Sequence, residues 1–180
     1  MSPWHRAARH VVLVGLMGSG KTTVGRIVAE RSKRPFVDSD EIIEGREGRT
    51  VREIWRSDGE RAFRVLETAA LSDALDDDTP SVIAAAGGVV LSDANRVALD
   101  AADALVVWLR ADPGLLVSRA ARADHRPLLD EDPAEALRWM AEAREPLYRD
   151  VADVVVDIGL RTPGEIADEI VRVASGGERD

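Results

Sequence analysis

One glycine-rich stretch limits what this chain can fold into more than any other feature. Residues 15–22 read Gly-Leu-Met-Gly-Ser-Gly-Lys-Thr and fit the pattern G-x-x-x-x-G-K-[ST] at every fixed position. An apolar run over residues 11–14 precedes the stretch, and a helical pattern over residues 23–30 follows it. The alternative is a plain glycine turn between a strand and a helix. The filled positions and both flanks favour a loop that binds a nucleotide.

The residue types of this loop suit a phosphate chain. Its glycines let backbone N–H groups and the positive end of the following helix converge on phosphate oxygens. Lys21 would reach the outer phosphates, and the Thr22 hydroxyl would ligate Mg²⁺. The loop therefore predicts binding of a nucleoside triphosphate with Mg²⁺. The other predicted nucleotide-binding residues of the loop are Gly18, Ser19, Gly20 and Thr23.

Apolar, strand-like runs alternate with helical patterns along the whole chain. The 180 residues are 45% hydrophobic and only 4% aromatic, which suits helices packed on a parallel sheet in a single domain. We therefore predict a three-layer α/β/α sandwich spanning residues 1–180, with flexible tails at 1–9 and 176–180. The expected strands lie at residues 11–14, 35–40, 81–85, 104–109 and 154–156.

Charge and composition exclude several other classes. A net charge of −9 argues against a nucleic-acid partner, which requires a basic surface. The chain has no cysteine, so thiol catalysis and thiolate metal sites are excluded. No apolar run is long enough to span a bilayer, and residues 1–9 lack the apolar core of a signal peptide. We expect a monomeric cytoplasmic protein that has no contact with membranes.

Two aspartates follow the second expected strand. Asp38 and Asp40 stand two residues apart in what reads as an extended segment, so we expect both side chains to project into one site beside the loop. One would meet the metal and the other the group to be phosphorylated. The alternative is that Asp40 merely caps a helix starting at Glu41. The fourth strand ends in Arg110 and not in an acid, which leaves Asp38 as the metal-side carboxylate.

The middle of the chain carries a charged helical region. We expect helix over residues 41–57, with interruptions at Gly45 and Gly48, and a second, long helix opening at residues 58–60. Arg64 and Glu67 lie three residues apart on one face of that long helix. Taken alone, such a pair would be a surface ion pair of little energetic value.

Residues 120–132 break the helical periodicity with a concentration of charge. Such a segment resembles a flap, and its arginines could close over phosphates and supply positive charge to a transition state. We therefore predict a lid at residues 120–132.

The order of the motifs along the chain resembles the shikimate kinases, from about residue 11 to residue 170. After the loop and the Asp-x-Asp pair come Gly-Glu-x-x-Phe-Arg-x-x-Glu at 59–67, Gly-Gly at 87–88, Arg-Pro-Leu-Leu at 126–129 and Arg-x-Pro-Leu-Tyr at 144–148. The resemblance implies a P-loop fold like that of the nucleoside monophosphate kinases, with sheet order 2-3-1-4-5. It also implies ATP-dependent phosphorylation of the 3-hydroxyl of shikimate, in the pathway to chorismate and the aromatic amino acids.

The resemblance also implies a role for individual residues. Shikimate would be held by Asp40, Arg64, Gly87, Gly88 and Arg144. Arg126 would be the lid arginine on the ATP phosphates, Arg119 would stack on adenine, and Arg161 and Pro163 would lie at the base-binding edge. Thr22, helped through water by Asp38, would hold Mg²⁺. Catalysis would fall to Lys21, Asp40 and Arg126.

One departure and two alternatives accompany this interpretation. The family usually has three glycines where this chain has Ala86-Gly87-Gly88, so we expect the Ala86 methyl group near the substrate pocket, where it could alter acceptor choice. Another P-loop kinase, acting on a sugar acid or polyol, is therefore an alternative. A non-catalytic nucleotide-binding module is the other, although Lys21, both aspartates and the lid arginine are all present.

Overall fold

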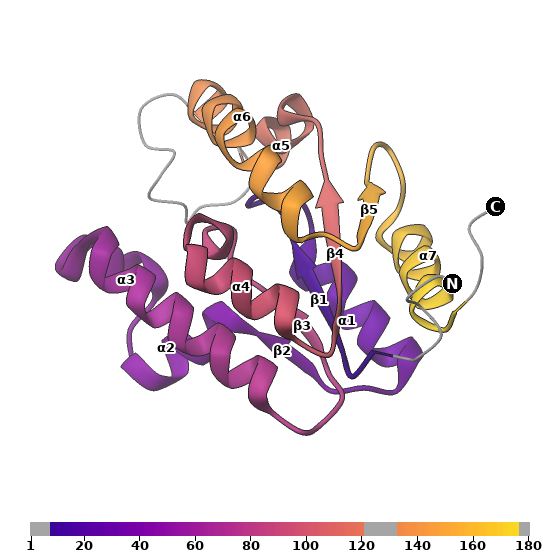
Figure 1. Cartoon of the computed structure of the whole chain (residues 1–180). Helices are drawn as coiled ribbons and strands as arrows, with labels where there is room; N and C mark the ends of the chain where they lie inside the picture. Colours follow the sequence, from indigo (N-terminus) through magenta and orange to yellow (C-terminus); the bar gives the residue numbers. More distant parts are fainter. Residues whose placement is uncertain (1–7, 121–132, 177–180) are drawn as a thin grey trace.

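The described residues, 8–120 and 133–176 of this computed structural model, contain a five-stranded parallel sheet (Figure 1). Its order is β2-β3-β1-β4-β5, so the predicted α/β architecture and strand order are confirmed. The strands are β1 (His10–Val14), β2 (Phe36–Asp38), β3 (Val82–Ala84), β4 (Ala104–Arg110) and β5 (Val154–Asp157).

Helices cover both faces of the sheet (Figure 1). The two helices on one face are α1 (Lys21–Ser32) and α7 (Pro163–Ala174), which pack against each other. On the other face and around its rim lie α2 (Ser39–Glu47), α3 (Val51–Asp76), the short 3-10 helix η1 (Val89–Leu91), α4 (Asp93–Ala101), α5 (Pro113–Ala120) and α6 (Pro133–Val151).

The central strand β1 shows how the sequence specifies two faces. Val11 and Leu13 pack into the apolar cluster that includes α1 and α7, whereas Val12 and Val14 pack into the cluster that includes α3, α4 and α6. Successive strand residues point to opposite faces, so a strand buried on both sides must be continuously apolar. This requirement explains the run of four apolar residues before the glycine-rich loop.

The glycines of the region between β2 and β3 behave differently from one another. Gly45 lies inside α2, so the interruption predicted there is wrong; a helix tolerates a single glycine at modest cost. Gly48 ends α2 in the left-handed conformation, as its position suggested. Gly59, with φ 82° and ψ 173°, breaks the helical geometry inside α3 and starts its long second part. The expected second helix therefore begins where the sequence placed it.

Several predicted segments fall partly outside the described residues. The predicted lid at 120–132 lies there from residue 121 onward, together with Arg126, and so do residues 1–7 and 177–180 of the predicted tails. Across residues 8–120 and 133–176, no helix combines the length and the apolar character needed to cross a bilayer.

Candidate active site

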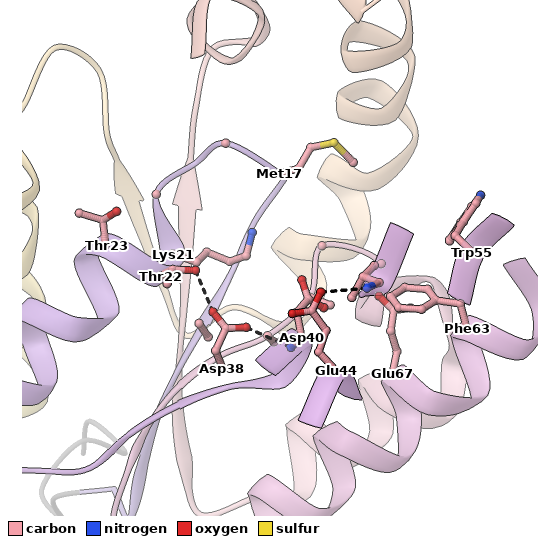
Figure 2. A pocket seen from close by; sticks show the side chains of 18 of the residues that line it. Met17, Lys21, Thr22, Thr23, Asp38, Asp40, Glu44, Trp55, Phe63 and Glu67 are labelled. Atoms are coloured by element: carbon pink, nitrogen blue, oxygen red, sulfur yellow. Dashed lines mark hydrogen bonds between the residues drawn. The ribbon is translucent and has the colours of Figure 1, made fainter. Parts of the chain in front are cut away.

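A cavity of about 610 Å³ opens where β1, β2 and β3 end (Figure 2). The segments that follow these three strands all contribute to its wall, because parallel strands bring their carboxyl ends to one edge of the sheet. The glycine-rich loop forms one end of the cavity, and residues of α3 form the other together with Gly87 and Gly88, which precede η1. The charged residues that line it are Lys21, Asp38, Asp40, Glu44, Arg64, Glu67, Arg119 and Arg144.

The glycine-rich loop has the geometry of a phosphate cradle. Gly15, Gly18 and Gly20 all have positive φ, and a Cβ at Gly15 would stand 2.8 Å from the Leu109 carbonyl oxygen. The Lys21 ammonium donates to the carbonyl oxygens of Gly15 and Leu16, at 2.7 and 3.0 Å. Helix α1 starts without a side-chain cap or an acid in its first turn, which favours an anion at its positive end.

Thr22 and Asp38 lie in direct contact at the loop. The Thr22 hydroxyl donates to the Asp38 carboxylate at 2.8 Å (Figure 2). The other oxygen of that carboxylate accepts from the Asp40 backbone N–H at 3.0 Å, which makes Asp38 the N-cap of α2. The prediction of an extended segment reaching Asp40 is therefore wrong, because the Asp38 cap starts the helix at Ser39. Asp40 nevertheless lines the same cavity, from the first turn of α2.

Asp40 is the most perturbed carboxyl group of the cavity wall. Burial, assisted by the charge of Asp38, raises the pKa of Asp40 to about 7 against the opposing pull of Lys21. One of its carboxylate oxygens, Oδ1, is buried and has no hydrogen-bond partner among the described residues. A carboxyl group that titrates near neutral pH and has an unused oxygen can accept a proton from a bound hydroxyl group.

Arg64 is clamped by two carboxylates at the opposite end of the cavity. Its guanidinium donates to Glu67 at 2.5 Å and to Glu60 at 3.0 Å. The Glu67 side chain is only 2% exposed, so the pair is not the surface ion pair that spacing alone suggested. Burial raises the pKa of Glu67, although the charge of Arg64 acts in the opposite direction. Holding this partly buried arginine in one orientation prepares its remaining N–H groups for an anion.

Arg144 approaches the same end of the cavity from α6. It donates to the Gly87 carbonyl oxygen at 3.2 Å, and the Tyr148 hydroxyl donates to that oxygen at 2.6 Å. Arg144 is 5% exposed, and its charge reaches Glu67 as well. The tyrosine was part of the recognised motif without a role; its contact shows that it fixes the backbone after β3. Arg64 and Arg144 thus converge on one region from two different helices.

The remaining predicted site residues divide into two groups. Those of the first group line the cavity: Gly18, Gly20, Thr23, Ala86, Gly87, Gly88, Arg119 and Pro163. Arg119 also donates to the Gly18 carbonyl oxygen at 3.3 Å. Arg161 is not part of the lining and pairs with Glu169 at 2.6 Å. Ser19 is buried, and its hydroxyl has no hydrogen-bond partner among the described residues.

Some residues of the cavity wall could not be given a role from the sequence. Among them are Met17, Glu44 and Trp55, which all line the cavity (Figure 2). Trp55 lies edge-on to Phe63 at 5.4 Å between ring centroids. A Trp inside a charged helical stretch, eight residues before the Phe-Arg motif, was the one signal that could have indicated its place.

Comparison with known proteins gives a consistent result. Residues 17–175 match the family model described as shikimate kinase. A shikimate kinase of Symbiobacterium thermophilum is 44% identical over 174 residues, which cover 94% of this chain and 99% of the relative. A shikimate kinase of Marinomonas sp. is 39% identical over 166 residues, covering 91% of each chain.

The structural comparison agrees with the sequence comparison. The solved structure of shikimate kinase from Acinetobacter baumannii in complex with shikimate matches this fold with a TM-score of 0.88 and 36% identity, over 93% of both chains. The phosphate loop, the Asp-x-Asp pair and the two converging arginines thus occur in a chain that matches such proteins over nearly its whole length. This chain belongs to the shikimate kinase family.

Proposed function

We propose that this protein transfers the γ-phosphoryl group of ATP to the 3-hydroxyl group of shikimate. The observation that carries the proposal is a single cavity with a phosphate loop at one end and two converging arginines at the other. A kinase for a small hydroxy acid needs both features within the length of one acceptor molecule. The relatives and the shikimate complex of the matched structure support shikimate as the acceptor.

The acceptor end suits a small carboxylate that bears hydroxyl groups. Arg64 and Arg144 present guanidinium groups, which pair with a carboxylate through two parallel hydrogen bonds. Asp40 stands between this end and the loop, where it would receive the proton of the reacting hydroxyl group. With a pKa of about 7, Asp40 would be ionised in a large fraction of molecules at neutral pH and still be basic enough to accept the proton.

The donor end suits the outer phosphates of ATP. Lys21 would exchange its loop carbonyl partners for phosphate oxygens, and Arg119 would lie beside the nucleotide. Charge neutralisation and positioning, not covalent chemistry, are the main requirements of phosphoryl transfer. The role of Arg126 as a lid arginine remains part of the proposal on the strength of the resemblance.

Thr22 and Asp38 fit Mg²⁺. A hydroxyl and a carboxylate in contact beside a phosphate loop are oxygen donors of the kind that Mg²⁺ takes, with phosphate oxygens and water completing the shell. When bound, Mg²⁺ would neutralise negative charge on the transferring phosphates. Among the described residues no group of three His, Cys, Asp or Glu side chains could hold a metal by itself, which agrees with an ion held mainly by ATP.

We also propose that the protein acts in the pathway to chorismate as a cytoplasmic monomer, with no nucleic-acid or membrane partner. The net charge of −9 supports the absence of a nucleic-acid partner. Gel filtration at micromolar concentration tests the oligomeric state.

An assay of ADP release tests the function. The purified protein is supplied with ATP, Mg²⁺ and, in separate reactions, shikimate, gluconate, glycerol and no acceptor. We expect release with shikimate at least about a hundredfold faster than with the other two acceptors. Glycerol would leave the charges of the arginines unpaired, and the flexible chain of gluconate would not hold its carboxylate and a reacting hydroxyl group in one fixed geometry. Phosphorus NMR of the product should place the new ester at the 3-oxygen. Comparable rates with gluconate or glycerol would contradict the proposal.

A further inference from the structure

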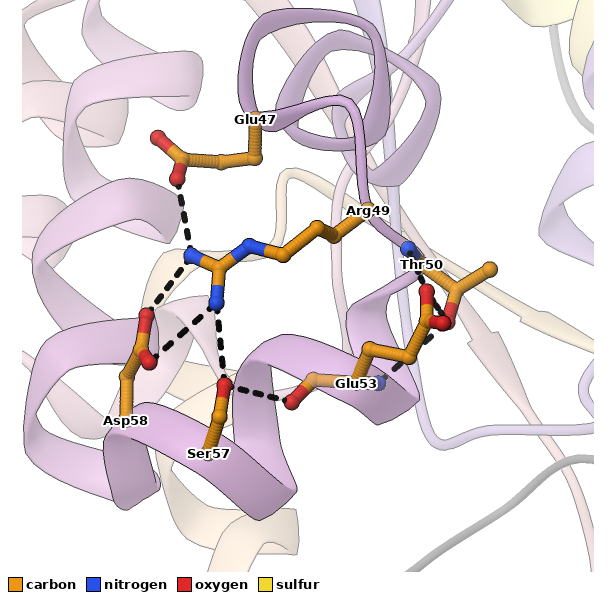
Figure 3. Close-up of polar contacts among 6 residues, drawn as sticks. All are labelled: Glu47, Arg49, Thr50, Glu53, Ser57 and Asp58. Carbon is orange, nitrogen blue, oxygen red and sulfur yellow. Dashed lines mark hydrogen bonds and ion pairs between the residues drawn. The ribbon is translucent and has the colours of Figure 1, made fainter.

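A network of polar contacts joins the end of α2 to the part of α3 that precedes Gly59 (Figure 3). Arg49, in the connection between the two helices, is at its centre. Its guanidinium donates to both oxygens of Asp58, at 2.7 and 3.2 Å. It also donates to the Ser57 hydroxyl at 2.9 Å and to Glu47 at 3.1 Å. One side chain thus ties three separate positions together.

The segment Val51–Asp58 is held differently at its two ends. At its start, Thr50 and Glu53 form a capping box, and the Glu44 carboxylate accepts from the Val51 N–H at 2.9 Å. At its end, the backbone of Gly59 leaves the helical conformation, so a kink separates the segment from the rest of α3. Ser57 and Asp58 are the last residues before this break, and both accept hydrogen bonds from the Arg49 guanidinium (Figure 3).

The position of this segment determines where Trp55 lies at the acceptor end of the cavity. Trp55 lies one helical turn before Asp58 and lines the cavity. Its ring contacts Phe63, and the Arg64 guanidinium carbon lies 5.3 Å from the centre of the Trp55 ring. Both partners belong to the part of α3 that follows Gly59. A displacement of Val51–Asp58 would therefore separate Trp55 from the arginine that faces the acceptor.

We propose that Arg49 is a positioning residue for acceptor binding, which acts by holding Val51–Asp58 so that Trp55 stays against Arg64. Arg49 does not line the cavity, so its influence runs through the segment and not through contact with the acceptor. A planar fork suits this task better than an ammonium group, because two parallel hydrogen bonds to one carboxylate fix an angle as well as a distance. The inference rests on the proposed function for the identity of the acceptor.

Steady-state kinetics of an Arg49→Ala variant test the proposal. The KM for shikimate should rise about three- to fivefold, the range that an exposed but forked and networked ion pair can supply. The KM for ATP and kcat should stay within about twofold, because the loop end of the cavity is untouched. Arg49→Lys should show an intermediate KM for shikimate, since lysine keeps the charge and loses the fork.

Arg46→Ala is the matched control. Arg46 also bridges α2 and α3, by a contact of 2.7 Å to Asp73, but Asp73 lies well beyond Gly59 and neither residue lines the cavity. The KM for shikimate should be unchanged in this variant. Equal increases in Arg46→Ala and Arg49→Ala would overturn the proposal, because any loosening of α2 against α3 would then suffice.

Hydrogen exchange separates this inference from the proposed function. Amides in residues 51–58 should exchange faster in Arg49→Ala than in the parent protein, whereas those in residues 60–76 should not change. This measurement needs no acceptor, so it tests whether Arg49 holds residues 51–58 in place even if shikimate is not the substrate. Unchanged exchange in residues 51–58 of Arg49→Ala would refute the role of Arg49. If the parent protein phosphorylates shikimate, an unchanged KM for shikimate in Arg49→Ala would refute it as well.

Discussion

Gly88 lies directly beneath the guanidinium of Arg64. A Cβ added at Gly88 would come within 1.7 Å of Arg64 Nη1 and 2.5 Å of its Cζ atom. The backbone of Gly88 is right-handed, with φ −92° and ψ −8°, so the requirement for glycine is one of space and not of conformation. The absence of a side chain at Gly88 thus lets the guanidinium of Arg64 lie close to the backbone that follows β3.

Replacing Gly88 by Ala should therefore damage acceptor binding more than folding. The methyl group must push Arg64 away from Glu67, and we expect the KM for shikimate to rise on the order of tenfold while the KM for ATP stays nearly constant. Gly45→Ala is the control, because a Cβ there meets nothing within 4 Å and the residue lies inside α2. It should leave both KM values unchanged and raise the Tm slightly. Similar kinetics in both variants would contradict this reading of Gly88.

We expect Asp40 to affect both activity and stability, because its pKa is raised. Its folded-state pKa of about 7 exceeds the ordinary value of 3.8, so its contribution to stability is fully present below about pH 4 and is lost as the pH rises through 7. Asp40→Asn removes the buried charge. The Tm of this variant should exceed that of the parent at pH 8 by several degrees, corresponding to up to about 4 kcal/mol, and by less at pH 5.

The same Asp40→Asn variant should lose at least about a hundredfold in kcat, because an amide cannot accept the proton of the acceptor hydroxyl group. Asp73→Asn serves as the control, since Asp73 is an exposed carboxylate on α3 that does not line the cavity. Its Tm difference from the parent should not depend on pH in this way. A variant Asp40→Asn less stable than the parent at pH 8 would show that the carboxylate is well solvated or fully paired.

Lys21 should be required for turnover and dispensable for folding. Lys21→Met removes the positive charge from the loop without opening a cavity in the apolar core, so kcat should fall about a hundred- to a thousandfold or more with little change in circular dichroism. Lys33→Met, at the opposite end of α1, removes the same charge away from the cavity and should retain activity. Comparable activity in the two variants would exclude a catalytic role for the loop lysine.

The local parts of this structure could be predicted from the sequence, and the parts set by tertiary contacts could not. The glycine-rich loop was recognisable because a phosphate chain imposes its geometry on eight consecutive residues. The helical start at Ser39 was missed, because the carboxylate of Asp38 satisfies the Asp40 N–H in preference to extending the strand. Sheet order depends on pairing between distant strands, and it came from the resemblance alone.

Burial was the other property hidden from the sequence. The spacing of Arg64 and Glu67 is the same in a surface ion pair and in the pair observed here, whose carboxylate is buried, so spacing could not distinguish them. Trp55 was hidden for a related reason. A helix broken at Gly59 turns its aromatic residue toward Phe63 and Arg64, and no periodicity within the helix encodes that direction.

The proposal that this protein selects a carboxylate-bearing acceptor depends on Arg64 and Arg144. Changing either residue to Ala should raise the KM for shikimate far more than that for ATP, with a loss of about 2–5 kcal/mol in kcat/KM for a desolvated charge pair. Lysine at either position should restore only part of the loss, because an ammonium group cannot reproduce the fork.

The most direct test of the account compares shikimate with its carboxamide in the parent protein and in Arg144→Ala. If the two arginines bind the carboxylate, the parent should use the amide with a kcat/KM lower by a factor of about thirty or more, and Arg144→Ala should discriminate far less between the two compounds. Such non-additivity is the signature of direct contact. Equal kcat/KM values for shikimate and its carboxamide in the parent protein would contradict the account, because the arginines would then serve the fold and not the acceptor.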